Sequence, residues 1–564
     1  MSPVKRTLVP VVSLAAAVVL AGVPAAPAAT GAHSSAGQPA SVHRSDKPDS
    51  VADRVVVIVV DALSREIVRK YHMHNVEALM RSGANAPNAY LGHLGAVTVV
   101  SHNVITTGAL PKHMGWTDEG YRDVDGVLAD EATNDSGMWL TSDFGKDEMF
   151  ALQDHAGYPH LADYLHAKRP GSKVVAISPK SYAAWGLGGR GADSIVTFSG
   201  RDYDCDGDGV DNWRGPDGVN VPTYLSQPAC GRFYVDSDPS LTYDTLQPPA
   251  RMYPLDGNRY TVGFDPQHKG GDVWATDAAI SVMKHERDWS GVFVTLPDVD
   301  KAAHMWGSVD DDGGDVPMTH LAFAARVADR QVGRIVGHLR RTGQLEDTLV
   351  VLTADHGSVP GRHFYGVDDG TPDRGYYNWY YGDLENDSYL SPQPALQPLV
   401  DTGNVAMTYS DSMVRAWLQD NSPAKRHQAV RVMARMPEVS AVWVRHGYRF
   451  RLATHVRWDR MSRAERAWFA AKAQTLLNTT AAPYGADVIA TLVDDTTYSV
   501  AGDHGGIQRR SQQIPIVFAG GGVGSRDLKA QVRSVDIVPT VLHALRIKAT
   551  HRLDGRGYRL PGLR

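Results

Sequence analysis

Carboxylates and imidazoles follow several apolar runs in this chain. The residues concerned are Asp61, Asp300, His304, Asp355, His356 and His504. Asp300 and His304 stand four positions apart, so one turn of helix would present both side chains on the same side. Oxygen and nitrogen ligands of this kind suit zinc, and they do not exclude manganese or iron. The pattern therefore indicates a site for divalent metal ions.

Each of these residues also has an ordinary structural explanation. A single Asp after a strand is more often a helix cap than a ligand, and an Asp–His pair at this spacing can be a surface pair that stabilises its helix. When several such residues follow strands of the same sheet, a shared site becomes the better explanation. The reason is that the carboxyl ends of those strands converge on one crevice. The expectation of a shared site therefore depends on the sheet.

Short apolar runs predict the strands of that sheet. They are residues 55–60, 174–177, 292–296, 349–352 and 516–519. Unbroken runs of this kind fit strands of a parallel sheet that is covered on both faces. Apolar residues recur every three or four positions from 321 to 339, which predicts a helix that Gly343 ends. The alternation predicts an α/β fold with a doubly wound, mostly parallel sheet and helices on both faces, in which ligands bind beyond the carboxyl ends of the strands.

The composition excludes several classes of protein. Of 564 residues, 43% are hydrophobic and 21% are charged, which excludes wholesale disorder and allows a large core. The net charge of -6 gives no indication of a nucleic-acid-binding surface, which would usually be basic. The chain has only two cysteines, so any metal must be held by His, Asp or Glu rather than by a Cys-based module.

The N-terminus has the order of a secretory signal. Residues 1–29 begin with basic residues, continue with an apolar stretch and end with small residues. A membrane anchor is the alternative, but an apolar stretch of about 17 residues that contains Pro10 is marginal for a bilayer crossing. Residues 30–53 lack apolar periodicity and are interpreted as a solvated linker. We expect a secreted protein that has no stable membrane span after removal of the signal.

Five motifs carry a resemblance to a known family. They are VVVIVVDA at 55–62, TVVSHNVITTGALPKHMG at 98–115, DKAAHMWG at 300–307, TADHG at 353–357 and GDHGG at 502–506. In this order they resemble the alkaline phosphatase superfamily, most closely its type I phosphodiesterase and nucleotide pyrophosphatase branch. The chain is also similar to the threonine-nucleophile alkaline phosphatases. The resemblance spans about 54–200, 270–357 and 490–547 and implies an alkaline-phosphatase-like fold with two insertions.

The resemblance implies two divalent ions side by side, usually zinc, and a threonine nucleophile. One ion would be held by Asp300, His304 and His504, and the other by Asp61, Thr98, Asp355 and His356. A bound dication would stabilise the alkoxide of Thr98, which then attacks phosphorus and leaves a phosphothreonine intermediate. Thr98 also precedes the apolar stretch 99–105, which predicts that it opens a helix whose dipole favours a phosphate oxyanion. The alternative is a Thr that only caps this helix.

Two departures from the family pattern concern the oxyanion. Phosphodiesterase relatives usually have Asn three residues after the threonine, where this chain has Ser101. The Ser101 hydroxyl can donate the same hydrogen bond, and the neighbouring Asn103 is a second candidate donor. Monoesterase relatives use another Asn further on, but the corresponding stretch here, HMGWTDEGYRD, contains none.

The expected catalytic domain runs from 54 to 547, followed by a C-terminal tail at 548–564. Two insertions are expected, at about 199–262 and about 357–490, and the second is expected to cap the active site. The first contains aspartates that alternate with glycines and could bind calcium: Asp202, Asp204, Asp206, Asp208 and Asp211. A solvated acidic turn is the alternative. Cys205 and Cys230 lie in the same insertion, and we hypothesise a disulfide between them.

Three functions follow as hypotheses. The first is an exported, metal-dependent phosphodiesterase or nucleotide pyrophosphatase that acts on small phosphate esters. The second is a phosphomonoesterase of the alkaline phosphatase type that scavenges phosphate. The third is a non-catalytic, calcium-stabilised binding protein that keeps the fold. A sulfatase with a cysteine-derived nucleophile is not favoured, because neither Cys205 nor Cys230 stands in a C-x-P-x-R signature. The sequence leaves the oligomeric state open.

Overall fold

The computed structural model describes residues 52–128, 137–141, 144–198, 216–225, 233–234, 269–311, 318–366, 394–500 and 502–563. Several sequence predictions fall outside these ranges. They are the signal at 1–29, nearly all of the linker at 30–53, the five aspartates of the acidic loop, and Cys205 with Cys230. In the described part, no helix is both long and apolar enough to cross a membrane.

A nine-stranded sheet forms the centre of the described residues. Its order is β20 (Arg526–Asp527), β2 (Ala84–Asn85), β19 (Ile516–Gly520), β11 (Thr348–Thr353), β1 (Arg54–Val60), β10 (Trp289–Leu296), β5 (Lys173–Ile177), β6 (Ser194–Phe198) and β7 (Pro216–Val219). The five strands from β11 to β6 are parallel. All five predicted strands are confirmed, and β1, β10 and β11 are buried along nearly their whole length, as the unbroken apolar runs indicated.

One of the predicted strands runs in the opposite direction. β19 pairs antiparallel with β11, and its first residue, Ile516, lies opposite Thr353, the last residue of β11. The segment before β19 is thereby brought to the same edge of the sheet as the carboxyl ends of the parallel strands. An apolar run reveals burial and not direction, which is why the sequence pattern could not show this.

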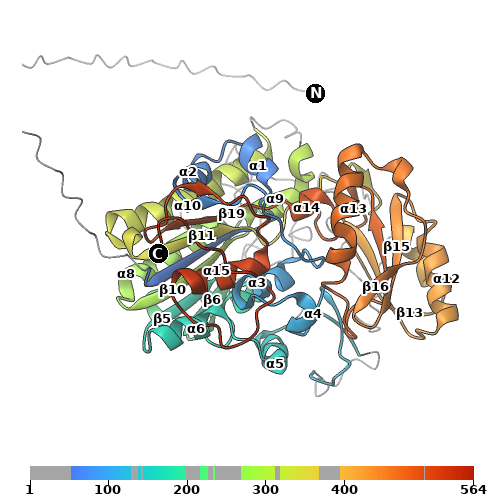
Figure 1. The fold of residues 1–564 in the computed structure, drawn as a ribbon, viewed down its shortest axis with the longest axis horizontal. Helices are drawn as coiled ribbons and strands as arrows, with labels where there is room; N and C mark the ends of the chain where they lie inside the picture. Colours follow the sequence, from blue (N-terminus) through green and yellow to red (C-terminus); the bar gives the residue numbers. More distant parts are fainter. Residues whose placement is uncertain are drawn as a thin grey trace, which may run out of the picture. The chain divides into compact units, whose positions relative to one another are not determined.

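Helices cover the sheet in two groups, with the central strands between them in Figure 1. One group is α2 (His74–Ser82), α8 (Gly271–His285), α9 (Asp298–Trp306) and α10 (His320–Arg341). The other is α3 (Thr98–Thr107), α6 (Leu161–Lys168), α7 (Ser181–Gly188) and α15 (Ile537–Ala544). The predicted helix at 321–339 is confirmed as α10, which Thr319 caps at its start and after which Gly343 adopts a left-handed conformation.

Shorter elements complete the central part. The helices are α1 (Arg65–Lys70), α4 (Pro111–Met114), α5 (Lys146–Ala156) and α14 (Arg509–Gln512), and the strands are β3 (Gly120–Arg122), β4 (Met138–Leu140), β8 (Phe233–Tyr234), β9 (Lys269–Gly270), β12 (His363–Phe364) and β18 (Thr496–Thr497).

A second, antiparallel sheet is built from the segment expected as the second insertion. Its order is β13 (Val405–Ser410), β14 (Met413–Leu418), β17 (Val488–Leu492), β15 (Val439–His446) and β16 (Arg449–Leu452). Helices α11 (Gln397–Val400), α12 (Pro423–Met433) and α13 (Arg463–Leu477) belong to the same segment, drawn in orange in Figure 1. We call this part the small sheet. One hydrophobic cluster lies within this part, and a second is shared with residues of the central part such as Tyr90 and Ile507. Strand β17 extends past the expected boundary at 490.

Two other expected boundaries differ from the structure. Strand β7 lies inside the expected first insertion, yet it pairs with β6 and so extends the central sheet. The expected tail at 548–564 packs on the core, because Asp554 bonds the backbone of Gly108 and Leu110 and Leu560 is buried. The tail is therefore part of the folded unit.

Candidate active site

The carboxyl ends of three central strands bring the predicted ligands together. Asp61 follows β1 directly, and Asp355 and His356 follow β11 after one residue. Helix α9 begins just after β10 and carries Asp300 and His304. These strands are neighbours in register, with Val60 opposite Leu296 and Val59 opposite Thr353. The sheet rule used for the sequence therefore gave the correct neighbourhood.

Four of the predicted residues meet at one ring nitrogen. His356 Nε2 lies 3.3 Å from Asp355 Oδ2, 3.4 Å from Asp61 Oδ1 and 3.4 Å from Thr98 Oγ1. These are the four side chains that the family resemblance assigned to one ion. Asp61 and His356 also form a compact group with Asp300, in which one ligand atom of each residue lies within 4.8 Å of the others.

The three residues assigned to the other ion also meet. Asp300, His304 and His504 each offer one ligand atom, and these atoms lie within 4.8 Å of one another. Asp300 Oδ1 is 3.2 Å from His304 Nε2 and 3.7 Å from His504 Nε2. The rings of His356 and His504 stack with centroids 3.6 Å apart, so the two groups of ligands are adjacent.

Backbone carbonyls orient two of the histidines. His356 Nδ1 lies 3.1 Å from the Gly357 carbonyl, and His504 Nδ1 lies 2.8 Å from the Ala96 carbonyl. A carbonyl can only accept, so Nδ1 carries the proton in both rings and Nε2 keeps a lone pair. Both Nε2 atoms face the carboxylates, which is the arrangement of metal-binding imidazoles.

Buried carboxylate oxygens provide a test of whether cations fit here. Asp61 Oδ1, Asp300 Oδ1 and Asp355 Oδ2 are buried and receive no hydrogen bond from the described part of the chain. Burial and the neighbouring Asp61 carboxylate raise the pKa of Asp355 well above its usual range. Burial also favours the neutral form of Asp300, but His304 and Lys180 outweigh it and hold the pKa of Asp300 well below its usual range. Oxygens that lack donors in a crowded acidic site fit divalent cations.

Lys180 lies among the same carboxylates, and the sequence analysis missed it. Its ammonium is 2.5 Å from Asp61 Oδ2 and 2.7 Å from Asp300 Oδ2, and the side chain is 1% exposed. Burial alone would lower the pKa of Lys180, but Asp300 and Asp61 raise it well above its usual range, so this lysine is charged. Lys180 stands three residues after β5, so the strand-end rule would have found it had cations been considered beside metal ligands.

The predicted nucleophile begins a helix, as expected. Thr98 is the first residue of α3, and no side chain caps this helix. His102, one turn later, lies with Nδ1 2.8 Å from the Thr98 carbonyl and Nε2 2.9 Å from Thr295 Oγ1, which fixes the start of α3 against β10. The Ser101 hydroxyl is buried and makes no hydrogen bond in the described part of the chain. The site thus contains a free helix N-terminus and an available hydroxyl donor.

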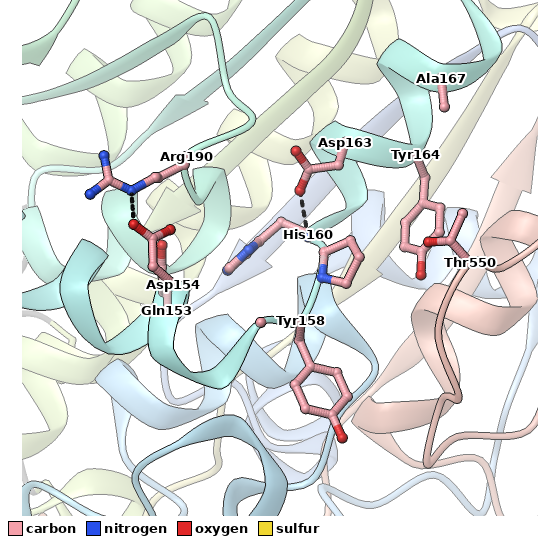
Figure 2. Close-up of a pocket in the computed structure, with 11 residues that line it drawn as sticks. Gln153, Asp154, Tyr158, His160, Asp163, Tyr164, Ala167, Arg190 and Thr550 are labelled. Atoms are coloured by element: carbon pink, nitrogen blue, oxygen red, sulfur yellow. Dashed lines mark hydrogen bonds and ion pairs between the residues drawn. The ribbon is translucent and has the colours of Figure 1, made fainter. Parts of the chain in front are cut away.

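Asn103, the second candidate oxyanion donor, is engaged elsewhere. Its amide donates to the Val99 carbonyl at 2.8 Å, and its Oδ1 accepts from Gln153 at 3.0 Å and lies 3.3 Å from His160 Nε2. Gln153 and His160 line a separate cavity of about 620 Å³, shown in Figure 2. Both ends of the Asn103 amide are therefore engaged in the packing of α3 and are not free for the role of an oxyanion donor.

Asp298, the first residue of α9, bonds the start of another helix. The Asp298 N–H donates to Asp272 Oδ1 at 3.0 Å, and the Asp272 N–H donates to Asp298 Oδ2 at 3.3 Å. Each aspartate thus accepts from an N–H in the first turn of the other's helix, while Pro297, the N-cap residue of α9, has no capping side chain.

The stretch that lacks the second Asn contributes buried carboxylates instead. Asp118 pairs with Arg415 Nε at 2.5 Å, and Arg415 also pairs with Asp411 at 2.7 Å. The Tyr409 hydroxyl donates to Glu119. We call Asp118, Glu119, Tyr409, Asp411 and Arg415 the Arg415 cluster. It joins the segment before β3 to strands of the small sheet.

Comparisons with known proteins agree with this geometry. The sequence profile of one family, type I phosphodiesterase / nucleotide pyrophosphatase, matches residues 55–507. The chain is 25% identical over 336 residues to alkaline phosphatase PhoK of a Sphingomonas species, an alignment that covers 55% of this chain and 56% of that protein. It is 23% identical over 556 residues to alkaline phosphatase PhoD of Zymomonas mobilis, which covers 92% of this chain and 89% of that one.

A solved structure shares the fold. The crystal structure of alkaline phosphatase PafA superposes with a TM-score of 0.55 at 15% identity, over 90% of this chain and 98% of the other. At this identity the likeness concerns the fold alone. It agrees with the doubly wound, mostly parallel sheet described above.

Proposed function

The chain belongs to the type I phosphodiesterase/nucleotide pyrophosphatase family of phosphoric ester hydrolases, within the alkaline phosphatase superfamily, and we propose that it hydrolyses phosphate esters through Thr98. The observation that carries this proposal is the convergence of ligands on the start of α3. Thr98 Oγ1 lies 3.4 Å from His356 Nε2, next to two adjacent groups of carboxylates and imidazoles. A threonine that only capped a helix would not need such neighbours.

We propose that the two ligand groups hold two divalent cations. Asp300, His304 and His504 would hold one, and Asp61, Asp355 and His356 would hold the other, together with Thr98. The mixture of carboxylate and imidazole donors favours zinc. When bound, the cations would supply positive charge that favours the Thr98 alkoxide and neutralises the phosphoryl oxygens.

The chain's own residues account for the transfer. The Thr98 hydroxyl loses its proton to water and its oxygen forms a bond to phosphorus. The bond from phosphorus to the ester oxygen breaks, and the leaving group departs with that electron pair and takes up a proton from water. Water then cleaves the phosphothreonine, which releases phosphate and restores the hydroxyl. The N-terminus of α3 favours negative charge at the phosphoryl group. The Ser101 hydroxyl, which is buried and has no partner in the described chain, donates to a phosphoryl oxygen.

Lys180 favours phosphomonoesters as substrates, the second of the hypotheses drawn from the sequence. A monoester carries one more negative charge than a diester, so it gains more from an additional cation in the site. Lys180 supplies a buried ammonium between Asp61 and Asp300, within hydrogen-bond distance of both carboxylates. The two relatives described above also bear the name alkaline phosphatase. Diesters, which the family name suggests, are the second candidate.

A paired assay tests both the reaction and the substrate class. Zinc-loaded wild-type protein is measured with a chromogenic monoester and the matching diester, and we expect a higher kcat/KM for the monoester. Thr98→Ala should lose turnover by about a thousandfold or more, because the nucleophile is gone. Its metal content, measured by mass spectrometry of the metals, should stay close to that of the wild type.

Other outcomes would contradict the proposal. Equal rates for Thr98→Ala and wild type would show that water attacks phosphorus directly. Inactivity of the wild type on both esters would favour the third hypothesis, a binding protein without turnover. A clear preference for the diester would assign Lys180 a structural role only.

We also propose that the protein is exported, on the basis of the signal-like order of residues 1–29. N-terminal sequencing of secreted protein tests this. A mature chain that still begins near Met1 would refute it.

A further inference from the structure

A turn of the small sheet lies against the loop that carries His504. The turn joins β13 to β14 and consists of Asp411 and Ser412. The Ser412 N–H donates to the His504 carbonyl at 3.0 Å, and its hydroxyl lies 2.8 Å from the same carbonyl and 2.5 Å from the Gly505 carbonyl. One residue of the small sheet therefore contacts two consecutive peptide groups at a predicted metal ligand.

The His504 loop depends on such contacts, because its own backbone is irregular. Gly505 has a φ of +96° and Gly506 a φ of +66°, and neither belongs to a helix or strand. The other hydrogen bonds of His504 involve its N–H and its ring and not its carbonyl. Asp503 Oδ1 accepts from the N–H at 2.8 Å, and the Ala96 carbonyl accepts from the ring. Ser412 is thus the residue that holds the carbonyl side of His504.

The turn is itself held rigidly. Asp411 Oδ1 accepts from the Met413 N–H at 2.8 Å, and Asp411 Oδ2 accepts from Arg415 at 2.7 Å. The Gln508 amide donates to the Ser412 carbonyl at 3.1 Å. A Cβ on Gly505 would come within 2.2 Å of Asp411 Oδ2, so the loop and the turn fit together closely. Because the turn is fixed in place, its contacts also fix the position of the His504 loop.

We propose that Ser412 is a positioning residue for His504, so that the small sheet sets the affinity of the ion held by Asp300, His304 and His504. The proposal rests on the proposed function only in that it requires this ion to bind. Residues that hydrogen-bond to a metal ligand and fix its orientation typically change metal affinity by about 10- to 100-fold when they are removed. Ser412 bonds the His504 loop and no hydrogen bond joins it to His356 in the described chain, so we expect the ion held by Asp61, Asp355 and His356 to be affected less.

The experiment compares two serine-to-alanine variants of the full chain. Ser412→Ala removes the hydroxyl bonds to His504 and Gly505. The matched control is Ser440→Ala, because the Ser440 hydroxyl is also buried in the small sheet and donates to a backbone carbonyl, that of Thr491, at 2.9 Å. Zinc affinity is measured for each protein by competition with a chromogenic chelator, and cobalt is substituted to record the visible spectrum of the bound ions.

For Ser412→Ala we expect one of two ions to bind about 10- to 100-fold more weakly, with a changed cobalt spectrum. Ser440→Ala should bind both ions as the wild type does, although both variants lose similar thermal stability in the metal-free form. Ser412→Thr, which keeps a hydroxyl, should restore the affinity. If Ser412→Ala binds both ions like the wild type, or if Ser440→Ala weakens binding equally, the positioning role is refuted. If the wild type binds no ions in stoichiometric amounts, the proposed function fails instead.

Discussion

Two residues of α3, two positions apart, have opposite surroundings. The Ser101 hydroxyl is buried without a partner in the described chain, whereas the Asn103 amide is bonded at both ends. We expect Ser101→Ala to lower kcat by about 10- to 100-fold, since one oxyanion donor typically contributes on this scale or more. Thermal stability should hardly change, because no hydrogen bond is lost.

Asn103→Ala is the matched comparison. It should lower the melting temperature, because Gln153 and the Val99 carbonyl lose a buried partner, while kcat per folded molecule stays near that of the wild type. Steady-state kinetics and thermal unfolding of both variants provide the measurement. The reverse pattern, with Asn103→Ala impaired in turnover and Ser101→Ala unaffected, would exchange the two assignments.

At this scale the sequence predicts residue types better than orientations. The candidate ligands could be named from the sequence because Asp, His and Thr stand in the family's motifs after apolar runs. Orientation depends on neighbours far away in the chain, such as Gln153 and His160 for Asn103. The pairing of Lys180 with Asp61 is of the same kind, since 119 positions separate the two residues.

Among the elements, the His504 loop and helix α9 approach each other closely at the candidate metal site. A Cβ on Gly502 would lie 1.6 Å from the Ala303 carbonyl, a distance at which the backbone must move. Because α9 carries Asp300 and His304, such a movement would separate them from His504. The glycine is therefore required by the space between these two elements.

We expect the Gly502→Ala variant to bind one divalent ion instead of two and to lose most of its catalytic activity. Gly337→Ala serves as the control, since this glycine lies within α10 and a Cβ there would meet only the end of the flexible Arg341 side chain. That variant should keep its metal content and its activity. Metal analysis of the purified proteins decides the matter, and full occupancy in Gly502→Ala would contradict the steric argument.

The elements themselves were largely predictable from the sequence. Burial on both faces makes the central stretches of β1, β10 and β11 mostly apolar, and the 3.6-residue period indicates α10. The antiparallel direction of β19 and the pairing of β7 with β6 were not predictable, because they depend on chain connections rather than on local pattern. The close packing of the C-terminal residues on the core was missed for the same reason.

For the molecule as a whole, the Arg415 cluster makes stability depend on pH. Burial raises the pKa of Glu119 to about 7, against the lowering effect of its hydrogen bond from Tyr409, and Asp118, Asp411 and Arg415 also face it. A carboxyl whose pKa is raised on folding binds its proton more tightly in the folded state. Its contribution to stability is thus complete below the unfolded pKa of about 4.5 and is lost as the pH rises through 7.

We expect Glu119→Gln to remove this dependence. Between pH 5 and pH 8, the wild type should lose up to about 3 kcal/mol of unfolding free energy relative to the variant, since one pKa unit corresponds to about 1.4 kcal/mol. Denaturant unfolding of both metal-free proteins across this range gives the difference between their unfolding free energies. The contributions of the other titrating groups largely cancel in this difference. A constant difference at all pH values would show that Glu119 does not titrate in this range.

The two strand-end loops that carry His356 and His504 touch one another, because Val359 and Asp503 form an antiparallel bridge. The described chain therefore leaves the central part for the small sheet, and returns from it, at neighbouring positions. A different module could therefore be inserted at this bridge without changing the strand connections of the central sheet. Such a module would have to replace the Ser412 contacts to the His504 loop and the ion pair of Arg415 with Asp118.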